Sequence, residues 1–152
     1  MKYISFAIPC YNSEAYMANA VESILKGGED VEIIIVNDGS KDRTSEIAHE
    51  FEAKYPTIIK AVDKENGGHG DAVNIGLEHA TGKYFKVVDS DDWVNEEALC
   101  KILDVLKKFE TDNEEIDMLL SNYVYEKEGM EHKKVIEYRN VLPQNTIFGW
   151  ND

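Results

Sequence analysis

The chain has 152 residues, of which 43% are hydrophobic and 30% are charged, as is typical of one soluble globular domain with its own core. Its formal net charge is −14 and no Lys/Arg cluster interrupts the acidity, so it lacks the basic surface that binding to nucleic acid or to an anionic membrane requires. The two cysteines, Cys10 and Cys100, have no paired spacing, which indicates a reducing compartment and excludes a disulfide or zinc framework.

The first part of the chain alternates short apolar runs with segments of helical spacing. Runs rich in β-branched residues predict buried strands, and apolar residues three and four positions apart predict helices. In chain order the sequence predicts a strand over 3–8 that ends at Pro9, a helix over 14–26, a strand over 31–36, a helix over 43–55, a strand over 57–62, a loop over 63–70, a helix over 71–80 and a strand over 84–88.

The second part is more acidic and its pattern is weaker. Asn95 is predicted to cap a helix whose apolar positions reach Phe109. After it the sequence predicts an acidic loop over 110–115, a strand over 117–125, a charged turn over 126–134 and a return strand over 135–138. The alternation predicts an α/β fold with a mostly parallel central sheet, and the lack of any linker predicts one domain over 1–152.

No segment predicts insertion into a membrane or export. No apolar run approaches the ~20 residues of a membrane helix, and the apolar run Met1–Ile8 is too short for a signal peptide. We therefore expect a soluble, cytoplasmic chain.

Polar loops follow each of the four early strands. They are residues 9–12, 37–40, 63–68 and 89–92. Because the carboxyl ends of parallel strands meet at one edge of the sheet, where α/β folds bind ligands, these loops are expected to lie together. Four such loops are what a nucleotide pocket requires.

The loop Asp89-Ser90-Asp91-Asp92 carries three carboxylates within four residues. Neighbouring carboxylates oppose each other's ionisation, and a divalent cation removes that conflict. Because Mg²⁺ often uses one or two protein carboxylates together with substrate phosphates, we expect a metal–diphosphate site at Asp89 and Asp91. The alternative is a solvated turn in which Asp92 or Asn95 caps the next helix.

Three residues in the other loops each have two interpretations. Tyr11 could stack on a base, or it is a partly buried aromatic at a strand end. Asp38 could accept a base N–H, or it forms a turn with Gly39. His69 contacts a substrate, or it is merely exposed in its glycine-rich loop.

The glycine-rich loop argues against two common nucleotide-binding folds. Gly68-His69-Gly70 has Val73 where a dinucleotide fingerprint needs a third glycine, and it follows the third strand rather than the first. There is no Walker lysine motif either. Gly67 and Gly68 are instead expected to let the backbone approach a ligand near a helix N-terminus. His49, His79 and His132 lack the spacing of a zinc site.

Taken together, these motifs resemble family 2 glycosyltransferases of GT-A fold. Residues 5–12 and 32–42 resemble the opening motifs, and residues 66–84 resemble the central block. Asp89-Ser90-Asp91-Asp92 is similar to the Asp-x-Asp metal motif of the family. The resemblance extends over residues 4–94 almost without gaps.

The resemblance implies a three-layer α/β/α, Rossmann-like domain of the nucleotide-diphospho-sugar transferases. Such a domain would transfer a sugar, with inversion, from a nucleotide-diphosphate sugar such as a UDP-sugar to an acceptor hydroxyl. The implied cofactor is Mg²⁺ or Mn²⁺, with Asp91 as its main ligand and Asp89 beside the ribose and the metal. The residues implied for nucleotide-sugar binding are Pro9, Tyr11, Asn12, Asp38, Asn66, Gly68, Asp71, Asp89 and Ser90. Val73 departs from the usual arginine, so a phosphate or base contact is missing or supplied elsewhere.

The family's general base lies beyond the residues that this chain matches. We therefore expect the donor-binding part of a longer enzyme, with the base and the acceptor-binding part outside this chain. The acceptor would be a saccharide or lipid-linked hydroxyl, and membrane association would come from other segments. Glu126, Glu128 and Glu131 fall in a charged turn and are expected to be solvated. The alternative is a nucleotide-sugar-binding module without turnover. A nucleotidyltransferase is disfavoured because the first loop lacks a glycine-rich signature with Lys or Arg.

Overall fold

The computed structural model describes residues 1–126 and 133–149, and its elements alternate as the sequence predicts. In chain order they are β1 (Ile4–Cys10), α1 (Met17–Leu25), the 3₁₀ turn η1 (Gly28–Asp30), β2 (Val31–Asp38), α2 (Thr44–Lys54), β3 (Ile59–Lys64), α3 (His69–His79), β4 (Tyr84–Val87), α4 (Glu96–Asp112), β5 (Tyr123–Tyr125) and β6 (Lys134–Ile136). They fall into two compact units, Met1–Lys108 and Phe109–Asp152, which are described separately.

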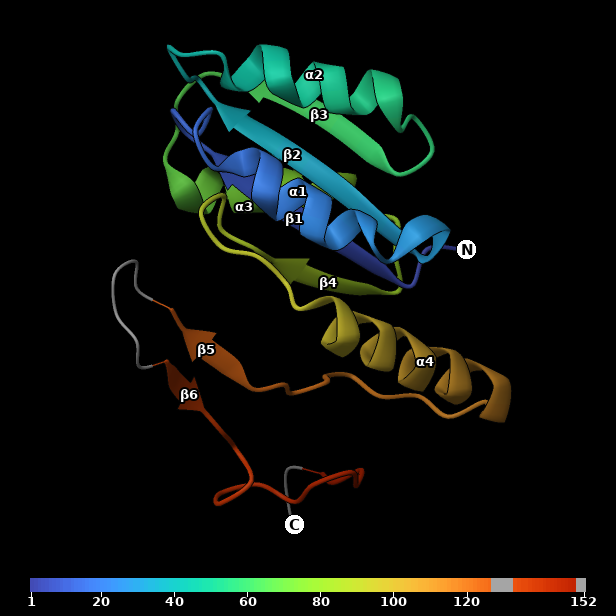
Figure 1. Ribbon diagram of the computed structural model, residues 1–152. Helices are drawn as coiled ribbons and strands as arrows, with labels where there is room; N and C mark the ends of the chain where they lie inside the picture. Colours follow the sequence, from blue (N-terminus) through green and yellow to red (C-terminus); the bar gives the residue numbers. More distant parts are fainter. Residues whose placement is uncertain (127–132, 150–152) are drawn as a thin grey trace. The chain divides into compact units, whose positions relative to one another are not determined.

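The first unit contains a parallel sheet with the strand order β3-β2-β1-β4 (Figure 1). Every pair in this sheet is parallel, which confirms the predicted arrangement. The order runs outward from β1 to β3 in one direction and then places β4 on the opposite side of β1. The carboxyl ends of β1 and β4 therefore meet at a topological switch point, the usual ligand position in an open α/β sheet.

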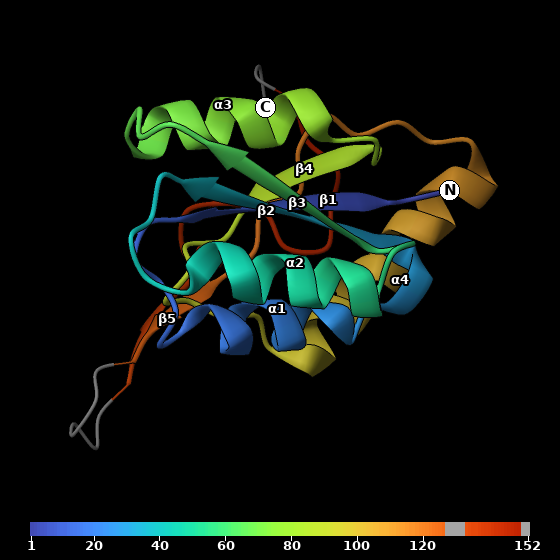
Figure 2. The same cartoon turned by 90° about the horizontal axis from the view of Figure 1, so that it is seen from above.

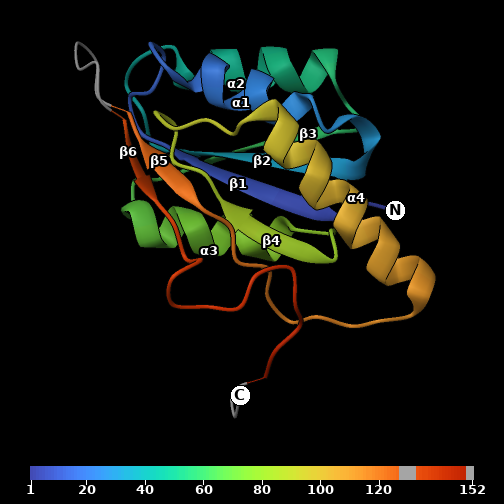
Figure 3. The ribbon, with the colours of Figure 1, turned by 60° about the horizontal axis from the view of Figure 1, so that its bottom comes forward.

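Helices cover both faces of this sheet, as the three-layer prediction requires. Figures 2 and 3 show α1 and α2 on one face and α3 on the other. Under α3, the buried side chains of Ile34 and Val36 pack with Ala72. Gly76 brings α3 close to β1, because a Cβ there would lie 2.5 Å from the Cβ of Ala7.

The first strand continues past Pro9 to Cys10, so the prediction that it ends at Pro9 is wrong. The Ala7 carbonyl accepts a hydrogen bond from Val88 at 3.0 Å, so Ala7 faces β4. Strand alternation turns Pro9 to the same side, but β4 pairs with β1 only as far as Val87. The missing N–H of Pro9 therefore leaves no partner unsatisfied.

Several predicted boundaries in the first unit shift by two or three residues. The first helix begins at Met17 rather than at residue 14, because the preceding residues form a turn in which the Ser13 carbonyl accepts from Tyr16 and Met17. The third strand covers 59–64 instead of 57–62, and α3 begins at His69 rather than at residue 71. The loop at the carboxyl end of β3 is correspondingly shorter than predicted.

The end of the chain differs more from expectation. The Asn95 side chain accepts from the Ala98 N–H at 2.9 Å, which confirms the predicted cap, but α4 runs on to Asp112 through part of the predicted loop. Only Tyr123–Tyr125 of the predicted strand over 117–125 pairs, with Lys134–Ile136. Most of the predicted charged turn, with Glu128 and Glu131, lies outside the described residues. No helix in the described ranges has the length and apolar character needed to cross a membrane.

A polar cluster joins β1 and β2 to the loop that precedes β4, at the amino edge of the sheet. The Glu32 carboxylate accepts hydrogen bonds from the Ser5 hydroxyl at 2.5 Å and from the Thr81 N–H at 2.8 Å. Ser5 is fully buried and also accepts from the Gly82 N–H. Burial by itself would raise the pKa of Glu32, but the hydrogen bonds from Ser5 and Thr81 outweigh it and lower the pKa.

We expect Glu32→Ala to lower the free energy of unfolding by about 1–3 kcal/mol, because the buried Ser5 hydroxyl loses its acceptor. A carboxyl whose pKa is lowered on folding adds stability above its ordinary value of 4.5 and loses it as the pH falls through the folded-state pKa. The difference from wild type should therefore shrink in acid. Urea unfolding at pH 7 and below pH 4 measures it, with the exposed Glu78→Ala as control. An equal difference at both pH values would contradict this role of the carboxylate.

Candidate functional site

A cleft of about 230 Å³ opens at the carboxyl edge of the sheet, at the switch point between β1 and β4. Its walls come from the ends of β1, β2 and β4 and from α3. They are formed by Pro9, Cys10, Tyr11, Asp38, His69, Ala72, Asp89, Ser90 and Asp91. Ligand pockets usually measure roughly 300–1,000 Å³, so these walls would enclose part of a nucleotide-sized ligand.

Asp38 is the most densely bonded acid in this cleft. Its side chain is 5% exposed and accepts from the Lys64 ammonium at 2.6 Å. The backbone N–H groups of Gly67 and Gly68 each donate to it at 2.8 Å. Burial works to raise the pKa of Asp38, but the lysine and the two amides outweigh it and lower the pKa. Asp38 is therefore a fixed anion at neutral pH.

The two glycines after β3 suit this arrangement. A Cβ on Gly67 would collide with the Asp71 carboxylate and lie 2.8 Å from the Lys64 ammonium. Gly68 has a φ of +89°, which side chains rarely adopt. The N–H groups of both glycines donate to Asp38. This role accounts for glycine at both positions without the close approach of a ligand that the sequence suggested.

The acidic loop after β4 forms a tight turn beside the cleft, with the Asp92 N–H donating to the Asp89 carbonyl at 2.9 Å. An Asp89 carboxylate oxygen lies 2.9 Å from His69 Nε2. Asp91 has no hydrogen-bond partner within the described ranges. The pKa of Asp92 is raised, first by burial and then by the charges of Asp91 and Asp89.

These carboxylates fit a divalent cation that also binds phosphate. Across residues 1–126 and 133–149, no group of three or more His, Cys, Asp or Glu side chains is arranged to hold a metal by itself. Mg²⁺ and Mn²⁺ prefer oxygen ligands, and Mg²⁺ often takes only one or two protein carboxylates and completes its shell with water and phosphate. Asp89 and Asp91 line the same cleft and provide such a donor set.

The loop after β1 contributes an exposed ring and a rigid support. Tyr11 is 51% exposed at the cleft, so its ring is available to a ligand rather than buried at the strand end. Asn12 has a φ of 50° and accepts from the Lys41 N–H at 2.8 Å. It thus joins the loops after β1 and β2. Burial raises the pKa of Cys10 to about 12, so its thiol stays protonated and is no nucleophile.

Three other predicted residues lie in or near the cleft. The Asn66 side chain donates to the Asp38 carbonyl at 3.0 Å. Asp71 pairs with Lys64 at 2.6 Å. Neither is a wall residue. Ser90 lines the cleft, and its hydroxyl lies 2.8 Å from that of Ser13.

Sequence reasoning overlooked Lys64 and gave no partner to His69 or His49. His49 lies 2.7 Å from Asp63, which also accepts from Asn37, and this interaction with Asp63 raises the pKa of His49. One signal for Lys64 was available. Aligning the carboxyl ends of β2 and β3 makes Asp38 and Lys64 register partners, although they are 26 residues apart.

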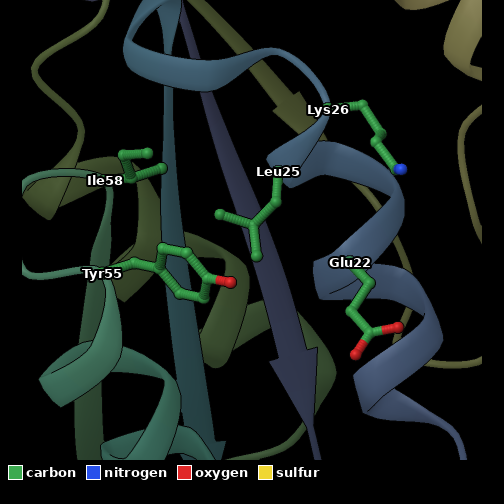
Figure 4. Close-up of a pocket in the computed structure, with 5 residues that line it drawn as sticks. All are labelled: Glu22, Leu25, Lys26, Tyr55 and Ile58. Carbon is green, nitrogen blue, oxygen red and sulfur yellow. The ribbon is translucent and has the colours of Figure 1, made fainter.

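A second hollow, of about 340 Å³, lies at the amino edge of the same sheet (Figure 4). It lies between the last turns of α1 and the residues that precede β3, and its walls are Glu22, Leu25, Lys26, Tyr55 and Ile58. It is larger than the cleft but has neither clustered carboxylates nor a glycine-rich turn. The cleft at the carboxyl edge is therefore the candidate functional site.

Comparison with known proteins finds similarity in both sequence and fold. Residues 5–140 match the sequence profile of the family described as Glycosyl transferase family 2. The chain is 38% identical over 118 residues to the minor teichoic acid biosynthesis protein GgaB of Bacillus subtilis, which covers 76% of this chain and 13% of GgaB. It is 31% identical to S. aureus TarS (residues 1–349), solved in complex with UDP-GlcNAc, with a TM-score of 0.59 over 72% of this chain and 32% of that one.

A more distant structure shares only the fold. This is the mannosyltransferase PcManGT of Pyrobaculum calidifontis, in complex with GDP-Man and Mn²⁺, at 22% identity and a TM-score of 0.59 over 70% of this chain and 32% of that one. The chain thus spans between about an eighth and a third of the length of these three proteins.

Proposed function

Since this chain belongs to glycosyl transferase family 2, we propose that it binds a nucleotide-diphosphate sugar in the carboxyl-edge cleft for inverting transfer of the sugar to an acceptor hydroxyl. The observation that carries the proposal is the convergence of Tyr11, Asp38, Asp89 and Asp91 from three strand ends on one cleft. In this arrangement one wall recognises the nucleoside and the other faces the diphosphate.

We propose a UDP-sugar as the donor. TarS is 31% identical to this chain and was solved in complex with UDP-GlcNAc. This similarity supports a uridine nucleotide as the donor's nucleotide. Tyr11 would lie on the base, while Asp38 would accept a base N–H and Pro9 would complete the base wall. Asp89 and Ser90 would face the ribose and the first phosphate. Asn12, Asn66, Gly68 and Asp71 would hold these groups in place.

Asp91, with Asp89, would hold Mg²⁺ or Mn²⁺ against the diphosphate. When bound, such an ion supplies Lewis-acid stabilisation of the charge that grows on the departing nucleoside diphosphate. The residues themselves orient the donor, because the Asp89 carboxylate is held by His69 and the turn is closed by its own backbone hydrogen bond. The acceptor hydroxyl would attack the anomeric carbon from the face opposite the leaving group.

We propose that this chain is the donor-binding domain, and that a residue outside it deprotonates a saccharide or lipid-linked acceptor. The free thiols of Cys10 and Cys100 favour a reducing, cytoplasmic setting. A nucleotide-sugar-binding module without turnover remains the alternative, and metal-dependent binding of UDP-sugars without release of UDP in any longer form of the protein would favour it.

Calorimetric titration of the chain with nucleoside diphosphates tests the proposal. We expect UDP to bind in the presence of Mn²⁺, to bind at least about tenfold more weakly with EDTA, and to bind more tightly than GDP. A folded chain that binds no nucleoside diphosphate in either condition would overturn the proposed function.

A further inference from the structure

Lys64 ends β3 beside the end of β2 and is absent from the family motifs that the sequence displays. Its ammonium lies 2.6 Å from Asp38 and 2.6 Å from Asp71, and it donates to the Glu65 carbonyl at 2.5 Å. The side chain is 15% exposed. An ammonium has three N–H groups, and all three have partners here. Lys64 therefore has no donor left for a phosphate and acts through the groups it already binds.

The most consequential of these groups is the Asp38 carboxylate. Oδ1 accepts from both Lys64 and the Gly67 N–H, whereas Oδ2 accepts from the Gly68 N–H only. A carboxylate offers about four acceptor sites, two on each oxygen. One site therefore remains, on Oδ2, and Asp38 lines the cleft.

We propose that Lys64 is a positioning residue that sets the nucleobase preference of the cleft. By filling Oδ1 together with Gly67, it leaves Asp38 able to accept a single N–H. The pairing edge of uracil has one N–H, whereas that of guanine has two donors side by side. The inference rests on the proposed function, because it requires the base of the donor to lie against Asp38.

Removing the ammonium would change the number of acceptors rather than only weaken the site. Without Lys64, each oxygen of Asp38 has one open site, the geometry in which a carboxylate accepts two parallel N–H groups. Guanine gains a second hydrogen bond in that case, while uracil loses a rigidly oriented partner. Nucleotide specificity is the difference between the binding free energies of UDP and GDP, so the ratio of their binding constants measures this change.

The test is calorimetric titration of UDP and GDP, each with Mn²⁺, into wild type, Lys64→Met and Lys60→Met. Lys60 is an exposed lysine of the same strand and serves as the matched control. We expect wild type and Lys60→Met to prefer UDP. In Lys64→Met the ratio of the UDP to the GDP binding constant should shift toward GDP by about tenfold. A purely structural lysine would lower both constants together and leave this ratio unchanged.

An unchanged ratio in folded Lys64→Met, with wild type preferring UDP, overturns the inference and leaves the proposed function intact. If wild type binds neither nucleotide, both the inference and the proposed function are wrong. Should Lys64→Met fail to fold in thermal scans, Lys64→Ser provides a second test, because its short side chain cannot fill Oδ1 of Asp38 and leaves room for water beside the two carboxylates. A shift of the ratio toward GDP supports the inference, and an unaltered ratio in folded Lys64→Ser overturns it.

Discussion

Replacing Asp91 with alanine is expected to abolish metal-dependent UDP binding, with a loss of affinity of at least about 100-fold in the presence of Mn²⁺. Asp91 lines the cleft and is not engaged by another described side chain, so its carboxylate is available to a cation. Asp89 would remain, but it is already bonded to His69. In Asp91→Ala, a cation held by two carboxylates and a diphosphate thus loses the carboxylate that has no other hydrogen-bond partner in the described residues. Calorimetry with and without EDTA measures the effect.

The matched control is Asp92→Asn. Asp92 belongs to the same acidic turn but is not a wall of the cleft, and its pKa is raised by burial and by its two acidic neighbours. Neutralising it should leave UDP affinity within about threefold of wild type, since it removes a repulsion and no ligand. If Asp92→Asn and Asp91→Ala weakened binding equally, the metal site would not be at Asp89 and Asp91.

Replacing Asp38 with alanine should have the second large effect, on both stability and binding. The side chain is 5% exposed and is the acceptor for Lys64 and for two backbone amides. Leaving those donors without an acceptor should lower the free energy of unfolding by about 3 kcal/mol. In a domain of this size that corresponds to a melting temperature lower by roughly 6–12 °C.

In Asp38→Ala the affinity for UDP should fall together with the free energy of unfolding, because the Gly67–Gly68 turn loses the carboxylate that orders it. The exposed Asp104→Ala on α4 serves as control and should change neither quantity. A variant that melts with wild type and still binds UDP with wild-type affinity would show that Asp38 neither orders this turn nor contacts the base.

The framework of the site could be predicted from the sequence because the end of each strand is recognisable from a few neighbouring residues. A β-branched run followed by Asn37-Asp38-Gly39 or by Asp89-Ser90-Asp91 is visible within a few residues, and parallel topology brings such ends together without further information. The parallel sheet was predicted in this way, while the two helical layers and the family were implied by the resemblance of the motifs, and all are confirmed.

What the sequence did not predict are pairings between residues that are distant in the chain. His69 and Asp89 are 20 residues apart and no spacing rule associates them, whereas Lys64 and Asp38, 26 apart, are associated only by aligning the ends of two strands. The predicted strand over 117–125 was wrong in its first part for a related reason. Its apolar composition suits a strand, but within the described ranges only Tyr123–Tyr125 pairs with another strand, and composition alone cannot form a hydrogen-bond ladder.

The most direct test of a nucleotide site at the carboxyl edge is a map of amide signals in the ¹⁵N-labelled chain, recorded with UDP and then with trace Mn²⁺. We predict that UDP shifts the signals of Tyr11, Asp38 and Gly68, and that Mn²⁺ broadens most strongly those around Asp89 and Asp91. The signals of the amino-edge hollow, including Leu25 and Tyr55, should stay unchanged. Shifts confined to that hollow, with the loop after β4 unaffected, would contradict the assignment of the site.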